Sequence, residues 1–89
     1  MNELVIYKTH YKFLSFLLKE PNQTLRNIER NTDISYIYLS MLYKKFKKHK
    51  LISVKRDGRK LCIALTDKGS SVTKDLEPII KLLKGDTNV

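Results

Sequence analysis

Cysteine and long apolar runs are scarce in this sequence, and their scarcity excludes several classes of protein. A single cysteine, Cys62, allows neither a disulfide within the chain nor a zinc site built from several thiolates. The apolar runs are only a few residues long, whereas a membrane-spanning helix needs roughly 18 apolar residues. No basic and then apolar leader with a small-residue cleavage site opens the chain. We therefore expect a cytoplasmic or nucleoid-associated protein that does not enter a membrane.

Groupings of residues that support catalysis are also missing. The sequence has no paired carboxylates, no Gly-rich phosphate-binding loop and no metal-ligand spacing, and His10, His49 and Cys62 are isolated from one another. We therefore predict that the protein is not an enzyme and has no catalytic residue, metal or cofactor. Cys62 alternates with apolar residues of a predicted strand, so we interpret it as a half-buried filler rather than a redox-sensing thiol.

Acidic residues are few, and the resulting positive charge is concentrated in one segment. The chain of 89 residues contains 18 Lys or Arg and 9 Asp or Glu, a formal net charge of +9. Residues 44–60 hold nine of the basic residues and one of the acidic ones, so this segment carries +8 and the rest of the chain only +1. Such a concentration favours a polyanionic partner over a merely solvated helix face. Nucleic acid is the first candidate and an anionic membrane surface the second.

The first two helices are predicted from the spacing of apolar residues. An N-terminal helix within residues 1–20 ends before Pro21, because the residue preceding a proline is disfavoured in the helical conformation. Residues 4–7 either extend this helix or form a short strand, and we favour the extension. A short helix over residues 25–31 follows, with Thr24 as its N-cap.

A third helix is predicted over residues 36–49, with Ser35 as its N-cap candidate. Its exposed face is basic, and a short turn separates it from the second helix. Two helices in this arrangement form a helix-turn-helix, here over residues 24–49. We expect the two helices to brace each other through Ile28, Ile34 and Leu39. The apolar stripe of the third helix consists of Leu39, Leu42, Tyr43 and Phe46.

The apolar pattern then changes from a helical to a two-residue period, which predicts a β-hairpin over residues 51–65. Asp57 and Gly58 indicate its turn, because both central positions of a type I′ turn take positive φ. A last helix is predicted over residues 67–84. Its interior Pro78 should kink or split it, because proline cannot donate the helical hydrogen bond.

The order of these elements resembles that of winged helix-turn-helix transcription regulators. Residues 24–52 look like the helix-turn-helix core, and residues 51–69 look like the wing that follows it. The run Leu65-Thr66-Asp67-Lys68-Gly69 is similar to the Leu-Thr-x-Lys-Gly stretch of MarR-like regulators. The expected fold class is a mainly α domain over residues 1–89, with a three-helix core, a β-hairpin wing and a C-terminal helix. The resemblance implies sequence-specific binding of double-stranded DNA, usually by a homodimer on a two-fold operator.

Two positions depart from the family pattern, which often has glycine in the turn and before the wing. Asp33 occupies the first position, and Asp accepts left-handed backbone at modest cost. Lys50 occupies the second position and accepts that conformation less easily. We therefore expect the third helix to end differently here.

Helix-turn-helix geometry assigns the third helix to the major groove as the recognition helix, and wing residues 54–61 to flanking phosphates or the minor groove. The N-terminal half of the recognition helix lacks Arg, Asn and Gln, the usual bidentate readers of bases, so we expect modest base specificity. Candidate contacts in that half are Ser35, Tyr36, Ile37, Ser40 and Met41. Candidate contacts to phosphates are Thr24, Lys44, Lys45, Lys48, Lys55, Arg56, Arg59 and Lys60.

The first and last helices carry more apolar surface than the core can bury, which predicts a homodimer formed through them. The alternative is a monomer in which the last helix folds back on the first. Because the chain has little material for a pocket and many MarR-like proteins are longer, we expect no small-molecule effector. Two other functions stay open: a winged-helix protein-interaction module, and an RNA or single-strand binder with tyrosines interleaved among its cations.

Overall fold

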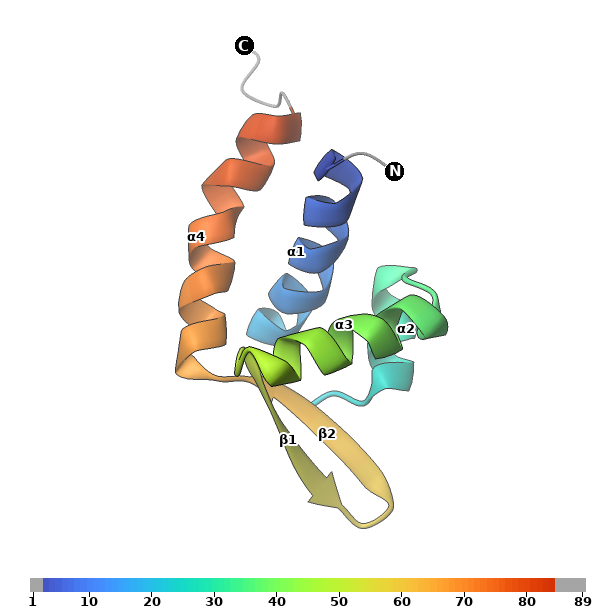
Figure 1. Cartoon of the computed structure of the whole chain (residues 1–89). Helices are drawn as coiled ribbons and strands as arrows, with labels where there is room; N and C mark the ends of the chain where they lie inside the picture. The colour runs from blue at the N-terminus through green and yellow to red at the C-terminus, as the bar shows by residue number, and fades with distance from the viewer. Residues whose placement is uncertain (1–2, 85–89) are drawn as a thin grey trace.

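The computed structural model describes residues 3–84, and the surroundings of side chains over residues 8–82. In chain order the elements are α1 (Glu3–Lys19), α2 (Leu25–Thr32), α3 (Tyr36–Lys48), β1 (Ile52–Asp57), β2 (Lys60–Leu65) and α4 (Asp67–Lys84). The β1–β2 hairpin extends away from the helices, and α4 runs back alongside α1 (Figure 1). Within the described residues, this mainly helical arrangement with a two-stranded sheet confirms the predicted fold class.

α1 includes residues 4–7, so the predicted helical extension is confirmed. Phe13 and Leu17 are buried on one side of the helix, because residues four apart lie on the same face. The helix ends two residues before Pro21, as the restriction on the residue before proline predicts.

The two helices of the helix-turn-helix begin at the predicted N-caps. The Thr24 hydroxyl accepts a hydrogen bond from the Asn27 N–H at 3.2 Å, and the Ser35 hydroxyl accepts one from the Tyr38 N–H at 3.3 Å. Between the helices Asp33 takes the left-handed conformation, with φ 58°. These local contacts fix where α2 ends and α3 begins.

α3 ends in a Schellman motif in which Lys50 holds the position that glycine usually takes. Lys50 is left-handed, with φ 61°. Its N–H donates to the Lys47 carbonyl at 3.1 Å, and the Leu51 N–H donates to the Phe46 carbonyl at 2.9 Å. The expectation that this helix ends differently is therefore wrong. The conformation costs roughly 1–2 kcal/mol for a residue with a Cβ, and the two hydrogen bonds offset that cost.

The core lies where α1, α2 and α3 meet. Phe13, Ile28 and Leu39 have no exposed surface, and they belong to one buried cluster. Ile34 lies in the same cluster, so the predicted brace between α2 and α3 is confirmed. The rings of Phe13 and Phe46 meet edge to face with their centroids 5.2 Å apart, which ties α3 to α1.

The turn of the hairpin lies one residue later than predicted. β1 and β2 pair antiparallel as far as Asp57 opposite Lys60, so Asp57 belongs to the ladder. The two turn residues are Gly58 and Arg59, and of these only Gly58 has positive φ, at 64°. Glycine at the first central position is the pattern of a type II′ turn, and the predicted type I′ turn is wrong.

A backbone bridge joins the wing to the start of α2. The Gln23 N–H donates to the Ile63 carbonyl at 3.0 Å, and the Ile63 N–H donates to the Gln23 carbonyl at 2.8 Å. Sequence patterns predict only a break between two helices at this point, because a single bridging residue has no periodicity. The bridge holds the first turn of α2 beside β2.

α4 is continuous through Pro78, so of the predicted kink or split the split does not occur. Leu76 and Ile80 pack inward before and after the proline, and Ile80 is only 2% exposed. Burial on both sides of Pro78 offsets the hydrogen bond that proline cannot donate.

The packing of α4 on α1 occurs within one chain (Figure 1). Burial, together with the nearby Glu77 carboxylate of α4, raises the pKa of the Tyr11 hydroxyl on α1. The arrangement is the fold-back of the monomeric alternative, and it covers part of the apolar surface that the sequence assigns to a dimer. Leu18, Ile79 and Leu82 remain exposed.

Replacing Leu39 with Ala should lower the free energy of unfolding by about 2–5 kcal/mol, because the fully buried side chain would leave a cavity in the core. Urea titration followed by circular dichroism measures the change. Ile37→Ala is the matched control in the same helix. Ile37 is 79% exposed, so its truncation should change stability by less than about 0.5 kcal/mol. Equal losses in the two variants would contradict the burial assigned to Leu39.

Candidate nucleic-acid interface

The outer side of α3 carries most of the residues that the sequence assigns to DNA. At its start Ile37 is 79% exposed and Met41 is 62% exposed, and Tyr36 beside them is also exposed. Large apolar side chains in such positions mark a surface that contacts a partner. Four exposed lysines follow along the helix: Lys44, Lys45, Lys47 and Lys48.

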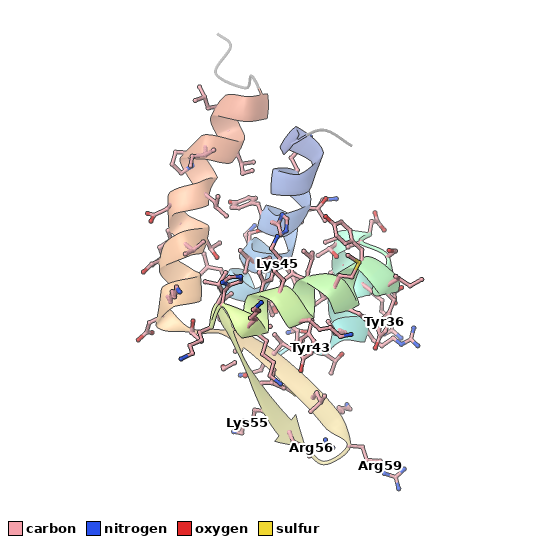
Figure 2. All side chains as sticks on the ribbon, viewed as in Figure 1. Tyr36, Tyr43, Lys45, Lys55, Arg56 and Arg59 are labelled. Atoms are coloured by element: carbon pink, nitrogen blue, oxygen red, sulfur yellow. The ribbon has the colours of Figure 1, made fainter. Side chains whose placement is uncertain are left out.

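The four predicted wing cations are all exposed, but they divide into two pairs. Arg59 and Lys60 line a groove that α3 also borders. Lys55 and Arg56 line a different hollow together with Cys62, whose predicted half-burial is confirmed. Figure 2 shows Arg59 at the tip of the hairpin, beyond Lys55 and Arg56.

The groove between the wing and α3 has a volume of about 310 Å³, and the first turn of α2 closes its third side. We name it the tyrosine groove, because Tyr36 and Tyr43 both line it. Its cations are Arg26, Arg59 and Lys60, and none of the described residues lining it is acidic. The remaining lining residues are Thr24, Leu25, Leu61 and Ile63.

Arg26 is missing from the candidates that the sequence suggests, and the fold brings it to the interface. Its Cζ atom lies 4.8 Å from the centre of the Tyr36 ring, and its Nη1 atom lies 3.5 Å from Oε1 of Glu29. The Arg26 side chain is still 72% exposed. The sequence signal for it is its place in the first turn after the Thr24 cap, since helix N-termini attract anions.

Three of the predicted contact residues use their hydroxyl groups within the protein. Thr24 and Ser35 accept backbone N–H groups as caps, which leaves each O–H able to donate to a phosphate. The Ser40 hydroxyl instead donates to the Tyr36 carbonyl at 3.0 Å. While that bond holds, Ser40 offers a base only an acceptor oxygen.

Lys45 lies on the side of α3 that faces away from Tyr43 and the wing (Figure 2). It lines an open hollow of about 680 Å³ between α3 and α1, together with His10 of α1. This volume is within the range of small-molecule sites, although the hollow is open to solvent on one side. The other lining residues are Ser35, Ile37, Tyr38, Met41 and Leu42.

The Leu-Thr-x-Lys-Gly run ties the end of α3 to the start of α4. The Thr66 hydroxyl donates to the Lys50 carbonyl at 2.7 Å and accepts from the Gly69 N–H at 3.0 Å. The Lys68 ammonium donates to the His49 carbonyl at 3.2 Å, where the last carbonyls of a helix favour a cation. The run therefore fixes α3 relative to α4.

The chain shares more with solved proteins in its fold than in its sequence. No protein-family model matches it. An uncharacterised protein of Archaeoglobus fulgidus is 35% identical over 57 residues, which are 64% of this chain and 58% of that protein. BpsR of Bordetella bronchiseptica has a TM-score of 0.82 at 22% identity, over 89% of this chain and 58% of BpsR. A MarR/EmrR family transcriptional regulator of Acinetobacter has a TM-score of 0.74 at 20% identity, over 88% of this chain and 57% of that protein.

These similarities decide the fold. It is the winged helix of MarR-type regulators. The chain spans less than two thirds of the length of each of the three proteins. The DNA binding of BpsR is regulated by 6-hydroxynicotinic acid, which conflicts with the expectation that a protein of this kind has no small-molecule effector. Over residues 3–84 no helix is long and apolar enough to cross a bilayer.

Replacing Thr66 with Val should lower the free energy of unfolding by about 1–2 kcal/mol, because the variant loses both the cap of α4 and the hydrogen bond to Lys50. The urea midpoint measures this loss. Ser71→Ala, at an exposed position of the same helix, should stay within about 0.5 kcal/mol of the parent. A Thr66→Val midpoint equal to that of Ser71→Ala would show that the Thr66 hydroxyl does not hold this junction.

Proposed function

We propose that the protein binds double-stranded DNA as a transcription regulator, in the cytoplasm or on the nucleoid. The observation that carries the proposal is the +8 charge of residues 44–60, which lies on the second half of α3 and on the hairpin beside it. The major groove of B-DNA, about 12 Å wide, admits one helix. The recognition helix over residues 36–49 enters this groove, and wing residues 54–61 lie on flanking phosphates or in the minor groove.

The start of α3 faces the edges of the bases in this proposal. Ile37 and Met41 are suited to the methyl group of thymine, and the Tyr36 hydroxyl can donate to a base or a phosphate. Lys44 and Lys48 are one turn apart on the same stripe of the helix and contact phosphates. The further contacts are Thr24, Ser35, Ser40, Lys55, Arg56, Arg59 and Lys60, with Lys45 adding to the field from the other side of the helix.

The proposed assembly is a homodimer through α1 and α4. The packing of these two helices within one chain leaves Leu18, Ile79 and Leu82 exposed, with Leu82 at 67%. Ile79 and Leu82 are three residues apart and lie on one stripe of α4. A two-fold interface places the same stripe of both copies together, which buries these side chains and presents two recognition helices to one duplex.

Selection of bound duplexes from a random pool tests the proposed function. We expect recovered sites with two half-sites related by a two-fold axis, their centres about one helical turn, roughly 10 base pairs, apart. Analytical ultracentrifugation of the free protein measures the dimer separately. Recovery of no duplex at any salt concentration would refute the proposal.

The same selection separates the two alternative functions. Tyr36 and Tyr43 line a basic groove, as stacking platforms for single strands do. A single-stranded competitor that displaces the duplex at equal concentration would therefore favour the RNA or single-strand alternative. A protein that binds neither form of nucleic acid would favour the protein-interaction alternative.

Binding should weaken steeply with salt, because the lysines that neutralise phosphates release counterions from the duplex. Replacing both Lys44 and Lys48 with Ala should reduce the slope of log affinity against log salt by roughly 0.9 for each phosphate that is no longer neutralised, and should weaken all duplexes alike. Fluorescence anisotropy over a salt series measures the slope. Lys74→Ala is the control, since this exposed lysine lies on α4 outside residues 44–60. An unchanged slope in the double variant would remove Lys44 and Lys48 from the interface.

A further inference from the structure

We propose that the tyrosine groove seats the sugar–phosphate strand that separates the major from the minor groove, with Arg26 as its anchoring phosphate contact. The inference rests on the proposed function and extends the interface to α2, outside the basic segment of residues 44–60. It also assigns a common role to Arg26 and Tyr36, whose side chains lie against each other: together they present a guanidinium to one phosphate.

The position of the groove follows from the docking of a helix and a wing on one duplex. A sugar–phosphate strand forms the boundary between a major groove and the neighbouring minor groove. The inference places α3 in the major groove and the wing in the neighbouring minor groove. The sugar–phosphate strand between these grooves then has to pass between α3 and the wing. The tyrosine groove lies there, bordered by α3, the wing and the first turn of α2 (Figure 1, Figure 2).

The lining of the groove suits both the phosphates and the deoxyribose sugars of such a strand. Arg26, Arg59 and Lys60 supply three positive charges for phosphates, and Tyr36 and Tyr43 add two hydroxyl donors. The groove also has apolar side chains that are suited to the C–H surface of deoxyribose. They are Leu25 and Leu61, whereas Ile63 lines the groove but is only 1% exposed.

Arg26 is held in place before DNA arrives. Its guanidinium lies over the Tyr36 ring at 4.8 Å, and the Glu29 carboxylate restrains one edge at 3.5 Å. The N–H donors of the guanidinium that do not face Glu29 remain available for a phosphate, which arginine binds in a forked geometry. The side chain is 72% exposed, so contact with the backbone of DNA requires no opening of the protein.

Backbone hydrogen bonds join two of the elements that border the groove, the start of α2 and β2. The reciprocal bonds between Gln23 and Ile63, at 3.0 and 2.8 Å, hold α2 beside the wing. Arg26 follows three residues after Gln23, on the first turn of α2. The backbone that carries Arg26 is therefore held beside β2, the strand that begins at Lys60 directly after Arg59.

The test combines single neutral phosphates with protein variants. In the duplex recovered by selection, each phosphate in turn is replaced by a neutral methylphosphonate, and the dissociation constant is measured by fluorescence anisotropy. For the parent chain we expect about a tenfold loss at one phosphate of the strand between the two grooves. Arg26→Ala should bind the unmodified duplex about tenfold more weakly, and it should lose the sensitivity at that phosphate.

Three further variants control this experiment. Arg30→Ala removes the same charge from an exposed position one turn along α2, outside the groove, and should keep the full phosphate sensitivity. Tyr36→Phe keeps the aromatic face but loses the hydroxyl donor, so it should bind the unmodified duplex more weakly and still keep the sensitivity at the phosphate assigned to Arg26. Tyr36→Leu removes that face and should reduce the sensitivity. Circular dichroism and the urea midpoint of each variant verify the fold.

The outcomes distinguish failure of the groove assignment from failure of the proposed DNA binding. If Arg26→Ala retains the sensitivity at every phosphate, the assignment of Arg26 is overturned while DNA binding stands. If Arg26→Ala prefers a different base sequence, Arg26 reads a base and the phosphate assignment is overturned. If the parent chain selects no duplex, the proposed function itself fails and the groove assignment fails with it.

Discussion

The left-handed turn at Lys50 is the constraint on which the placement of α3 and the wing depends. It ends α3, and the Leu51 N–H that follows closes the helix on the Phe46 carbonyl. The Leu51 carbonyl accepts the Thr66 N–H at 3.0 Å, and Gly69 lies so close to this oxygen that a Cβ would overlap it. α3, β1 and α4 therefore meet within a few backbone atoms, with no room to slide past one another.

This junction matters for the proposed homodimer. Two recognition helices can engage one operator only if their separation matches the spacing of the half-sites. The proposed interface involves α4, whereas the proposed base contacts lie on α3, so the separation is set by the connection between these helices. The hydrogen bonds from Thr66 to Lys50 and from Lys68 to His49 supply that connection. In the proposal, the Leu-Thr-x-Lys-Gly run therefore contacts no DNA but sets the position of the DNA-contacting helix α3 relative to the dimer-forming helix α4.

Features that depend on local chemistry were predictable from the sequence. The helices follow from apolar periodicity, and their starts follow from the side chains of Thr24 and Ser35. Features that depend on contacts between residues distant in sequence could not be predicted from the sequence. Lys50 takes a conformation that its side chain disfavours, because the junction around it supplies hydrogen bonds. The turn shifts to Gly58 and Arg59 because cross-strand pairing decides the register of a hairpin.

The same distinction applies to the candidate site. The concentration of charge indicates the recognition helix and the wing, and in the structure both of them border the tyrosine groove. Arg26 carries no such signal, because a single arginine on a short helix is ordinary in sequence. Its proximity to Tyr36 comes from the turn between α2 and α3, and its proximity to the wing comes from the bridge between Gln23 and Ile63.

The interface has many charges but few groups that read bases, and the tyrosine groove changes what this implies. In the proposed function the lysines on α3 attract every duplex alike, and the first half of the helix contains no Arg, Asn or Gln to form bidentate contacts with bases. In the proposed complex, the tyrosine groove between α3, the wing and α2 would receive a sugar–phosphate strand best where the path of that strand fits the groove. The path depends on the local shape and stiffness of the DNA, which depend on its sequence. If the strand is seated as proposed, the tyrosine groove therefore adds sequence preference to an interface whose lysines supply mainly affinity.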